Sequence, residues 1–170
     1  ARLKAEQIEN WLAERDGDSK VLGADEGVAG RVDQFVHSPH DARLAKPVLD
    51  RFESLRAAYS YHSILLFDAS GRLLLLLGDD EDNTPALQQQ LRLALTSKQV
   101  QHGDLYRDQS GHIHLDWVVP ISGPQGKRPL AVAVLRVSAP RFLFPLIQTW
   151  PTASPSAETL LVRREGESVL

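Results

Sequence analysis

Residues 61–77 of the chain are YHSILLFDASGRLLLLL, and the elements on either side of this stretch can be placed relative to it. Two apolar runs, 61–68 and 72–77, each have the length of a strand and are rich in leucine and aromatic side chains. Between them, residues 69–71 are Ala-Ser-Gly, and the glycine permits a tight turn. We therefore predict a β-hairpin over residues 61–77.

One helix and three more strands are predicted downstream of this hairpin. The helix, 84–96, begins with Thr84 as its N-cap and Pro85 at its first helical position. The predicted strands are 99–107, 112–121 and 130–138. Short glycine-containing connections join them, so neighbouring strands should pair as antiparallel hairpins.

Three amphipathic helices are predicted upstream of the hairpin, because apolar side chains recur there at helical spacing. Asp41 is the expected N-cap of the third helix. The predicted helices are 2–22, 25–37 and 41–58.

This order of elements predicts an α+β domain with a five-stranded antiparallel sheet, a long N-terminal helix and flanking helices. The length of 170 residues and the hydrophobic content of 42% are enough for one core. We place the domain at residues 1–145. Residues 146–170 are assigned to a linker and to either the start of a following module or an extra hairpin.

Composition excludes several classes of function. The net charge is −3 and no basic stripe is present, so we expect no nucleic-acid partner. Without cysteine, the chain has no disulfide and no thiol nucleophile. The sequence contains no Gly-x-Ser-x-Gly, phosphate-binding glycine loop or His-Glu-x-x-His motif. We therefore predict no catalytic residues, no cofactor and no enzymatic activity for this chain.

Three segments resemble the extracytoplasmic PAS-like sensor domains known as Cache or PDC domains. Residues 4–15, KAEQIENWLAER, resemble the lead helix of double-Cache sensors in bacterial diguanylate cyclases and histidine kinases. Residues 66–73, LFDASGRL, resemble their first hairpin. Residues 158–166, ETLLVRREG, resemble the opening of their second module.

The resemblance implies an extracytoplasmic (periplasmic) small-ligand sensing domain of a membrane-anchored signalling protein, either a GGDEF diguanylate cyclase or a histidine kinase. It implies that the chain is a piece of a longer receptor, that its N-terminal helix continues from a transmembrane helix, and that this helix forms a homodimer. The alternative is a ligand-free structural, dimerisation or protein-interaction module. Amino-acid-sensing members carry a Tyr, Arg, Trp and Tyr cluster that does not follow Tyr59 and Tyr61 here, so an amino-acid ligand is not expected.

The two longest predicted strands alternate in a way that defines two sheet faces. Odd positions of 112–121 are all apolar and should face a core, whereas the even positions are mixed. In a PAS-like sheet the mixed face lines the ligand cavity. The candidate ligand-binding residues are therefore Tyr106, His114, Asp116 and Arg136. Arginine can hold a carboxylate through two parallel hydrogen bonds, and aspartate can accept from an ammonium group.

Simpler interpretations remain open for the charged residues of this face. Asp116 and Arg136 on neighbouring strands can form a cross-strand ion pair that needs no ligand, and we favour this interpretation. His112 and His114 share a strand face and, with Asp116, have the spacing of a metal chelate. A zinc site usually needs three or four firm ligands, and His112 should be solvated beside its turn, so we predict no metal site.

Overall fold

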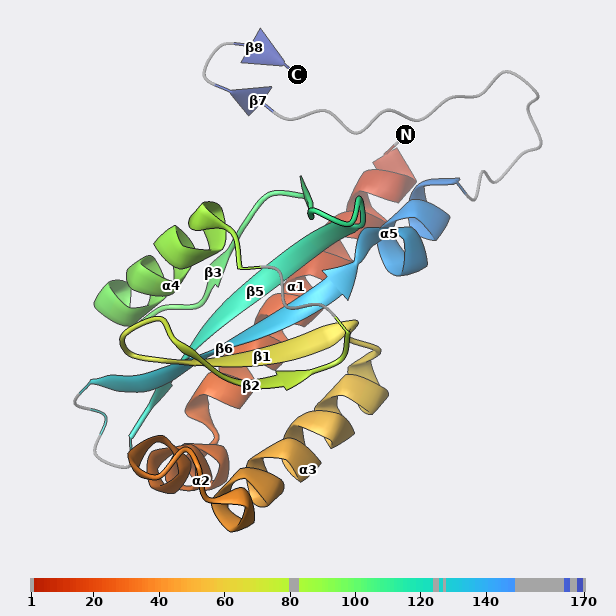
Figure 1. Ribbon diagram of the computed structural model, residues 1–170. Helices are drawn as coiled ribbons and strands as arrows, with labels where there is room; N and C mark the ends of the chain where they lie inside the picture. Colours follow the sequence, from red (N-terminus) through yellow and green to blue (C-terminus); the bar gives the residue numbers. More distant parts are fainter. Residues whose placement is uncertain are drawn as a thin grey trace.

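The computed structural model describes residues 2–79, 83–123, 126 and 128–148, and the backbone of residues 164–165 and 168–169. It has an antiparallel sheet with helices on both faces, which confirms the predicted α+β class and the long N-terminal helix (Figure 1). The helices are α1 (Arg2–Ala24), α2 (Glu26–His37), α3 (Ala42–Tyr59), α4 (Pro85–Ser97) and α5 (Ala139–Gln148). The strands of the main sheet are β1 (Ser63–Asp68), β2 (Leu73–Leu77), β3 (Gln101–His102), β4 (Tyr106–Arg107), β5 (Ile113–Ser122) and β6 (Pro129–Ser138).

The strand order is β2-β1-β6-β5-β3, and β4 also pairs with β5. All of these pairs are antiparallel, as the short connections predicted. The register between β5 and β6 places Asp116 directly opposite Arg136.

The sheet differs from the prediction in one strand. The segment 99–107 forms two short strands, because His102 pairs with Trp117 and Tyr106 pairs with His114. Three residues, 103–105, therefore oppose only two residues of β5, which is the arrangement of a β-bulge. The segment also passes close to α4: a Cβ on Gly103 would lie 2.5 Å from the side-chain nitrogen of Gln90.

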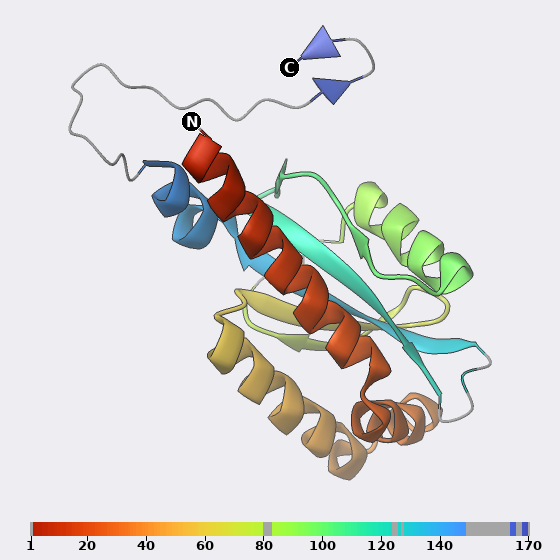
Figure 2. The same cartoon turned by 180° about the vertical axis from the view of Figure 1, so that it is seen from behind.

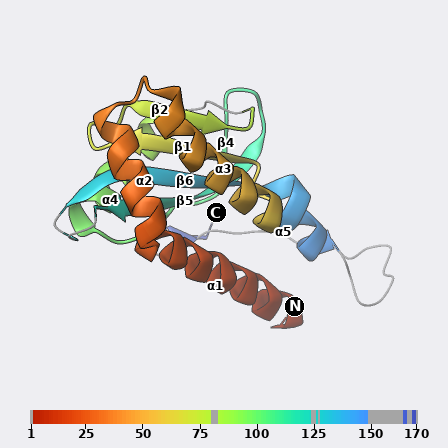
Figure 3. The same cartoon turned by 90° about the horizontal axis from the view of Figure 1, so that it is seen from below.

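One face of the sheet packs against α1, α2 and α3. Figure 2 shows α1 running diagonally across this face, and α2 and α3 lie side by side over it in Figure 3. The apolar odd positions of β5 from Leu115 onward and those of β6 are buried in this core, whereas Ile113 is half-buried against Ala139 and Leu143 of α5. On this face the Trp117 ring meets the Trp11 ring of α1 edge-to-face at 5.6 Å.

Helix α4 covers the opposite face. Leu87, Leu91 and Ala94 of α4 pack against residues of β1, β5 and β6 in a second core. Thr84 is the N-cap, as predicted, because its hydroxyl accepts a hydrogen bond from the Leu87 amide at 3.1 Å. Two separate cores, one on each face, therefore fix the sheet between α1 and α4.

Beyond residue 148 the structure describes only a short hairpin. Strands β7 (Arg164–Glu165) and β8 (Ser168–Val169) pair antiparallel there, and residues 158–162 lie outside the described residues. The boundary at residue 145 stays a prediction. In the part of the chain that the structure describes, no helix combines the length and hydropathy needed to span a membrane.

Candidate functional site

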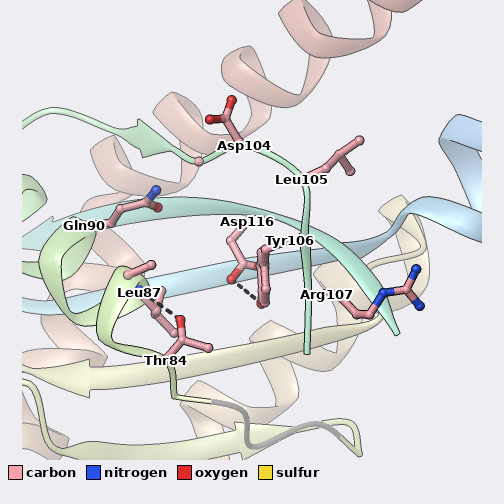
Figure 4. Close-up of a pocket in the computed structure, with 10 residues that line it drawn as sticks. Thr84, Leu87, Gln90, Asp104, Leu105, Tyr106, Arg107 and Asp116 are labelled. Carbon is pink, nitrogen blue, oxygen red and sulfur yellow. Dashed lines mark hydrogen bonds between the residues drawn. The ribbon is translucent and has the colours of Figure 1, made fainter. Parts of the chain in front are cut away.

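A cavity of about 350 Å³ lies between α4 and the bulged segment that joins β3 to β4 (Figure 4). This volume is at the lower end of the range for small-molecule sites, about 300–1,000 Å³. The residues that line it are Thr84, Ala86, Leu87, Gln90, Gly103, Asp104, Leu105, Tyr106, Arg107 and Asp116.

The local structure explains why the cavity forms at this place. Thr84, Leu87 and Gln90 are spaced three residues apart at the start of α4, so they lie along neighbouring turns of one helix side. The bulge at 103–105 takes the chain out of the ladder opposite them. The cavity is therefore bounded by one helix, one bulge and the sheet face beneath.

Asp116 lines the cavity, and beneath it lies a buried ion pair with Arg136, to which Tyr106 adds a hydrogen bond. The Arg136 guanidinium donates to both Asp116 carboxylate oxygens, from Nε and from Nη2, at 3.0 Å each. The Tyr106 hydroxyl donates to Asp116 Oδ2 at 2.9 Å, and Figure 4 shows these two side chains pointing toward one another. The Asp116 and Arg136 side chains are only 4% and 0% exposed. The favoured cross-strand pair is thus present, but it is buried rather than at the surface.

The four predicted ligand-binding residues are neighbours, although only two of them reach the cavity. Tyr106 and Asp116 line it, whereas Arg136 and His114 are not among its lining residues. The Arg136 guanidinium lies 5.7 Å from the centre of the Tyr106 ring, and the His114 ring lies 5.8 Å from the same Tyr106 ring, centroid to centroid. Because the fork of Arg136 is engaged by Asp116, we assign Arg136 to positioning Asp116 rather than to holding a ligand carboxylate.

His114 is directed instead toward the turn between β4 and β5. Its Nε2 lies 2.9 Å from Asp108 Oδ2, and both side chains are buried. Burial by itself raises the pKa of the Asp108 carboxyl, but hydrogen bonds from His114 and from the His112 amide outweigh it and lower that pKa to about 2. Asp108 is therefore a carboxylate at neutral pH.

Four further polar residues of the cavity were not predicted from the sequence, namely Thr84, Gln90, Asp104 and Arg107. The sequence around Thr84 predicts only a helix cap. Gln90 lies three residues after Leu87, and this spacing was the available signal that both face the same side of α4. No local pattern placed Asp104 and Arg107 at the cavity, because their positions depend on the bulge.

No protein-family profile and no curated protein sequence matches the chain. Several solved structures do match it. One is the ligand-binding domain of the Campylobacter jejuni chemoreceptor Tlp3 in complex with L-norvaline, with 12% identity, a TM-score of 0.61, and coverage of 87% of this chain and 59% of that one. A domain assigned to a sensory box/GGDEF family protein of Vibrio parahaemolyticus has 15% identity, a TM-score of 0.62, and coverage of 87% and 61%. The ligand-binding domain of the Pseudomonas aeruginosa amino acid chemoreceptor PctC, in complex with GABA, has 18% identity, a TM-score of 0.55, and coverage of 87% and 61%.

These similarities show the fold. The chain has the architecture of the sensory domains of bacterial receptors, as its resemblance to Cache and PDC domains predicted. It spans about three fifths of the length of the structures that it matches.

Proposed function

We propose that this chain is the extracytoplasmic ligand-sensing part of a membrane-anchored bacterial signalling protein, with a GGDEF diguanylate cyclase or histidine kinase output. A small polar molecule binds between α4 and the bulged segment. The chain itself binds and transmits, and has no catalytic role. The observation that carries the proposal is the cavity itself, because its lining combines apolar wall with a few polar groups, as a small-molecule site requires.

The lining residues suggest the chemistry of the ligand. Asp104 suits an amine and Arg107 suits a carboxylate. Both are exposed residues of the cavity lining, and the Arg107 guanidinium also donates to the Gly111 carbonyl at 2.9 Å. Gln90 and Tyr106 add hydrogen-bonding groups, and Leu87 and Leu105 add apolar wall. The similar receptor domains were solved with L-norvaline and with GABA, which are small molecules of this kind. We therefore propose a ligand that carries an amino or carboxylate group on a short carbon skeleton.

Strand β5 offers a direct route from the cavity to α1. Asp116 faces the cavity, and the next residue, Trp117, faces α1 on the other side of the sheet. The Trp117 indole donates a hydrogen bond to Asp16 of α1 at 2.7 Å. A ligand in the cavity would change the position of the sheet against α1 if it binds one position of β5 more tightly than another, because a ligand shifts a conformational equilibrium only through such a difference in affinity.

Two exposed apolar side chains of α1 support the proposed homodimer. Leu3 and Val21 are 70% and 69% exposed. They are 18 residues apart, or about five turns, so they lie on the same side of the helix. The exposed residues between them on this side include Gln7, Asn10 and Glu14, so the proposed contact with α1 of a second copy would be largely polar with an apolar residue near each end.

The experiment is a thermal-shift screen with amino acids, amines, short carboxylates and sugars, followed by calorimetry on each compound that raises Tm. We expect Gln90→Ala to weaken binding by about two- to tenfold, since it removes one hydrogen-bonding group from the cavity wall. Gln89→Ala changes the adjacent, exposed position of α4 and should bind like the wild type. Equal binding by both variants and the wild type would refute this cavity as the site.

One observation favours the alternative of a ligand-free module. The Asp116 carboxylate already accepts three hydrogen bonds from Arg136 and Tyr106 without a ligand. If no compound of the screen raises Tm, the structural or dimerisation role becomes the better account.

A further inference from the structure

Asp108, His112 and His114 form a compact cluster at the turn between β4 and β5. One ligand atom from each residue lies within 4.8 Å of the other two. Asp108 Oδ2 is 2.9 Å from His114 Nε2 and 3.3 Å from His112 Nδ1. The sequence spacing suggests Asp116 as the third ligand beside the two histidines, but the structure commits Asp116 to Arg136 and Tyr106. Asp108 takes that position.

The local fold fixes all three side chains toward one point. His114 is in β5, and His112 immediately precedes the first residue of that strand, Ile113. The two are alternate residues of the segment that enters β5, and their rings lie 6.0 Å apart, centroid to centroid. The turn brings Asp108 back against them, with the Gly111 amide donating to the Asp108 carbonyl at 3.1 Å. The His112 amide donates to Asp108 Oδ1 at 2.7 Å, which leaves Oδ2 between the two imidazoles.

We propose that Asp108, His112 and His114 bind a divalent transition-metal ion, with Zn²⁺ as the best match. Two imidazoles and one carboxylate are the ligand types that zinc takes in sites with an open fourth position. Ligand atoms around a tetrahedral zinc, at bonds of about 2.0–2.2 Å, lie roughly 3.4 Å apart. The two observed separations, 2.9 and 3.3 Å, need little change to reach this value.

Burial also suits a metal site. The Asp108 and His114 side chains are 3% and 1% exposed, whereas the His112 side chain is 67% exposed. Two ligands are therefore held by the interior, and the third lies at the surface, where the ion enters and where water can complete the coordination.

Metal binding here would act on the cavity wall. Tyr106 and Arg107 line the cavity and immediately precede Asp108 in the chain. An ion held by Asp108 and His112 of the turn and by His114 of β5 would tie the turn that follows that wall to the sheet. The bound ion would thus add a second connection to the sheet, beyond the pairing of β4 with β5, at one end of this wall.

The same contacts are also those of a turn held by hydrogen bonds alone, and metal titration distinguishes such a turn from a metal site. Untagged, metal-free protein is titrated with Zn²⁺ by calorimetry. We expect one ion per chain and a rise in Tm on saturation, since the ion binds the folded state. His112→Ala should weaken this binding at least about 100-fold, because even the hydrogen-bond partners of metal ligands change affinity by about 10–100-fold. Folding should be retained, because His112 is exposed.

His40→Ala is the matched control, since His40 is an exposed histidine outside the cluster. It should bind Zn²⁺ like the wild type. Titration with Co²⁺ gives a second readout, the visible absorption bands of a low-symmetry cobalt site, which should be present in His40→Ala and absent in His112→Ala. Wild-type protein without one-to-one binding, or His112→Ala with wild-type affinity, would overturn the proposal. Equal losses in His112→Ala and His40→Ala would overturn it as well.

Discussion

Replacing Asp116 by asparagine tests the buried pair beneath the cavity with almost no change of shape. The Arg136 side chain is 0% exposed. Asp116→Asn removes the carboxylate that pairs with its guanidinium and so leaves this buried positive charge without a counter-charge. Loss of one partner of a buried pair typically costs about 3–5 kcal/mol, because the remaining charge is uncompensated. That is a large fraction of the stability of a typical domain, about 5–15 kcal/mol.

The assay is urea denaturation of the wild type, Asp116→Asn, Arg136→Met, and the double variant Asp116→Leu/Arg136→Met. The double variant should recover most of the loss, because apolar residues of similar volume can replace a buried pair at little cost. Asp50→Asn is the control, since it breaks an exposed i,i+4 pair with Lys46 and should cost only about 0.3–0.5 kcal/mol. A cost for Asp116→Asn no greater than that of Asp50→Asn would show that the buried pair does not stabilise the fold in this way.

Three further predictions concern the elements around the cavity. Thr84→Ala removes the N-cap hydrogen bond of α4 and should lower the free energy of unfolding by about 1 kcal/mol in urea, whereas Thr96→Ala in the last turn should change it far less. Gly78→Ala should lower the free energy of unfolding by more than about 1 kcal/mol, because φ is +110° and a Cβ would lie 2.8 Å from the His62 carbonyl oxygen. Gly17→Ala is the control in α1, where a Cβ meets open space, and it should raise the free energy of unfolding by about 0.5–1 kcal/mol. Burial raises the pKa of Asp68, but hydrogen bonds from the following turn outweigh it and lower that pKa. The stability that Asp68 contributes is fully present above its pKa in the unfolded chain, about 3.9, and is lost as the pH falls through its lower pKa in the folded protein. Urea titrations between about pH 5 and 2.5 should therefore show a smaller loss of stability on acidification for Asp68→Asn than for the wild type.

Local patterns were sufficient to predict much of the fold. The alternation over 112–121 identified the face of β5 that packs on α1, since a buried face requires one set of apolar side chains. Thr84 and Pro85 marked the start of α4, because caps are local features of the chain. The even positions of 112–121 and 130–138 placed His114, Asp116 and Arg136 on one sheet face, and in the structure these side chains lie close to Tyr106. That they bind a ligand stays a prediction.

Long-range register was not predictable in the same way. The bulge at 103–105 exists only in relation to the two residues of β5 that it opposes, and its own sequence shows no more than one glycine. The position of Asp108 against His114 likewise follows from the path of the turn. The burial of the pair between Asp116 and Arg136 was not predicted, because charged side chains are mostly exposed and the cover over this pair depends on the tertiary packing of neighbouring elements.

The proposed sensing function requires that a ligand in the cavity affects α1 through β5. The most direct test is a ¹H–¹⁵N NMR titration with the compound that raises Tm most, following the Gln90 amide in the cavity wall and the Trp117 indole N–H that donates to Asp16. Both signals should shift and should saturate at the same ligand concentration. A Gln90 signal that shifts while the Trp117 indole stays unchanged would contradict the coupling.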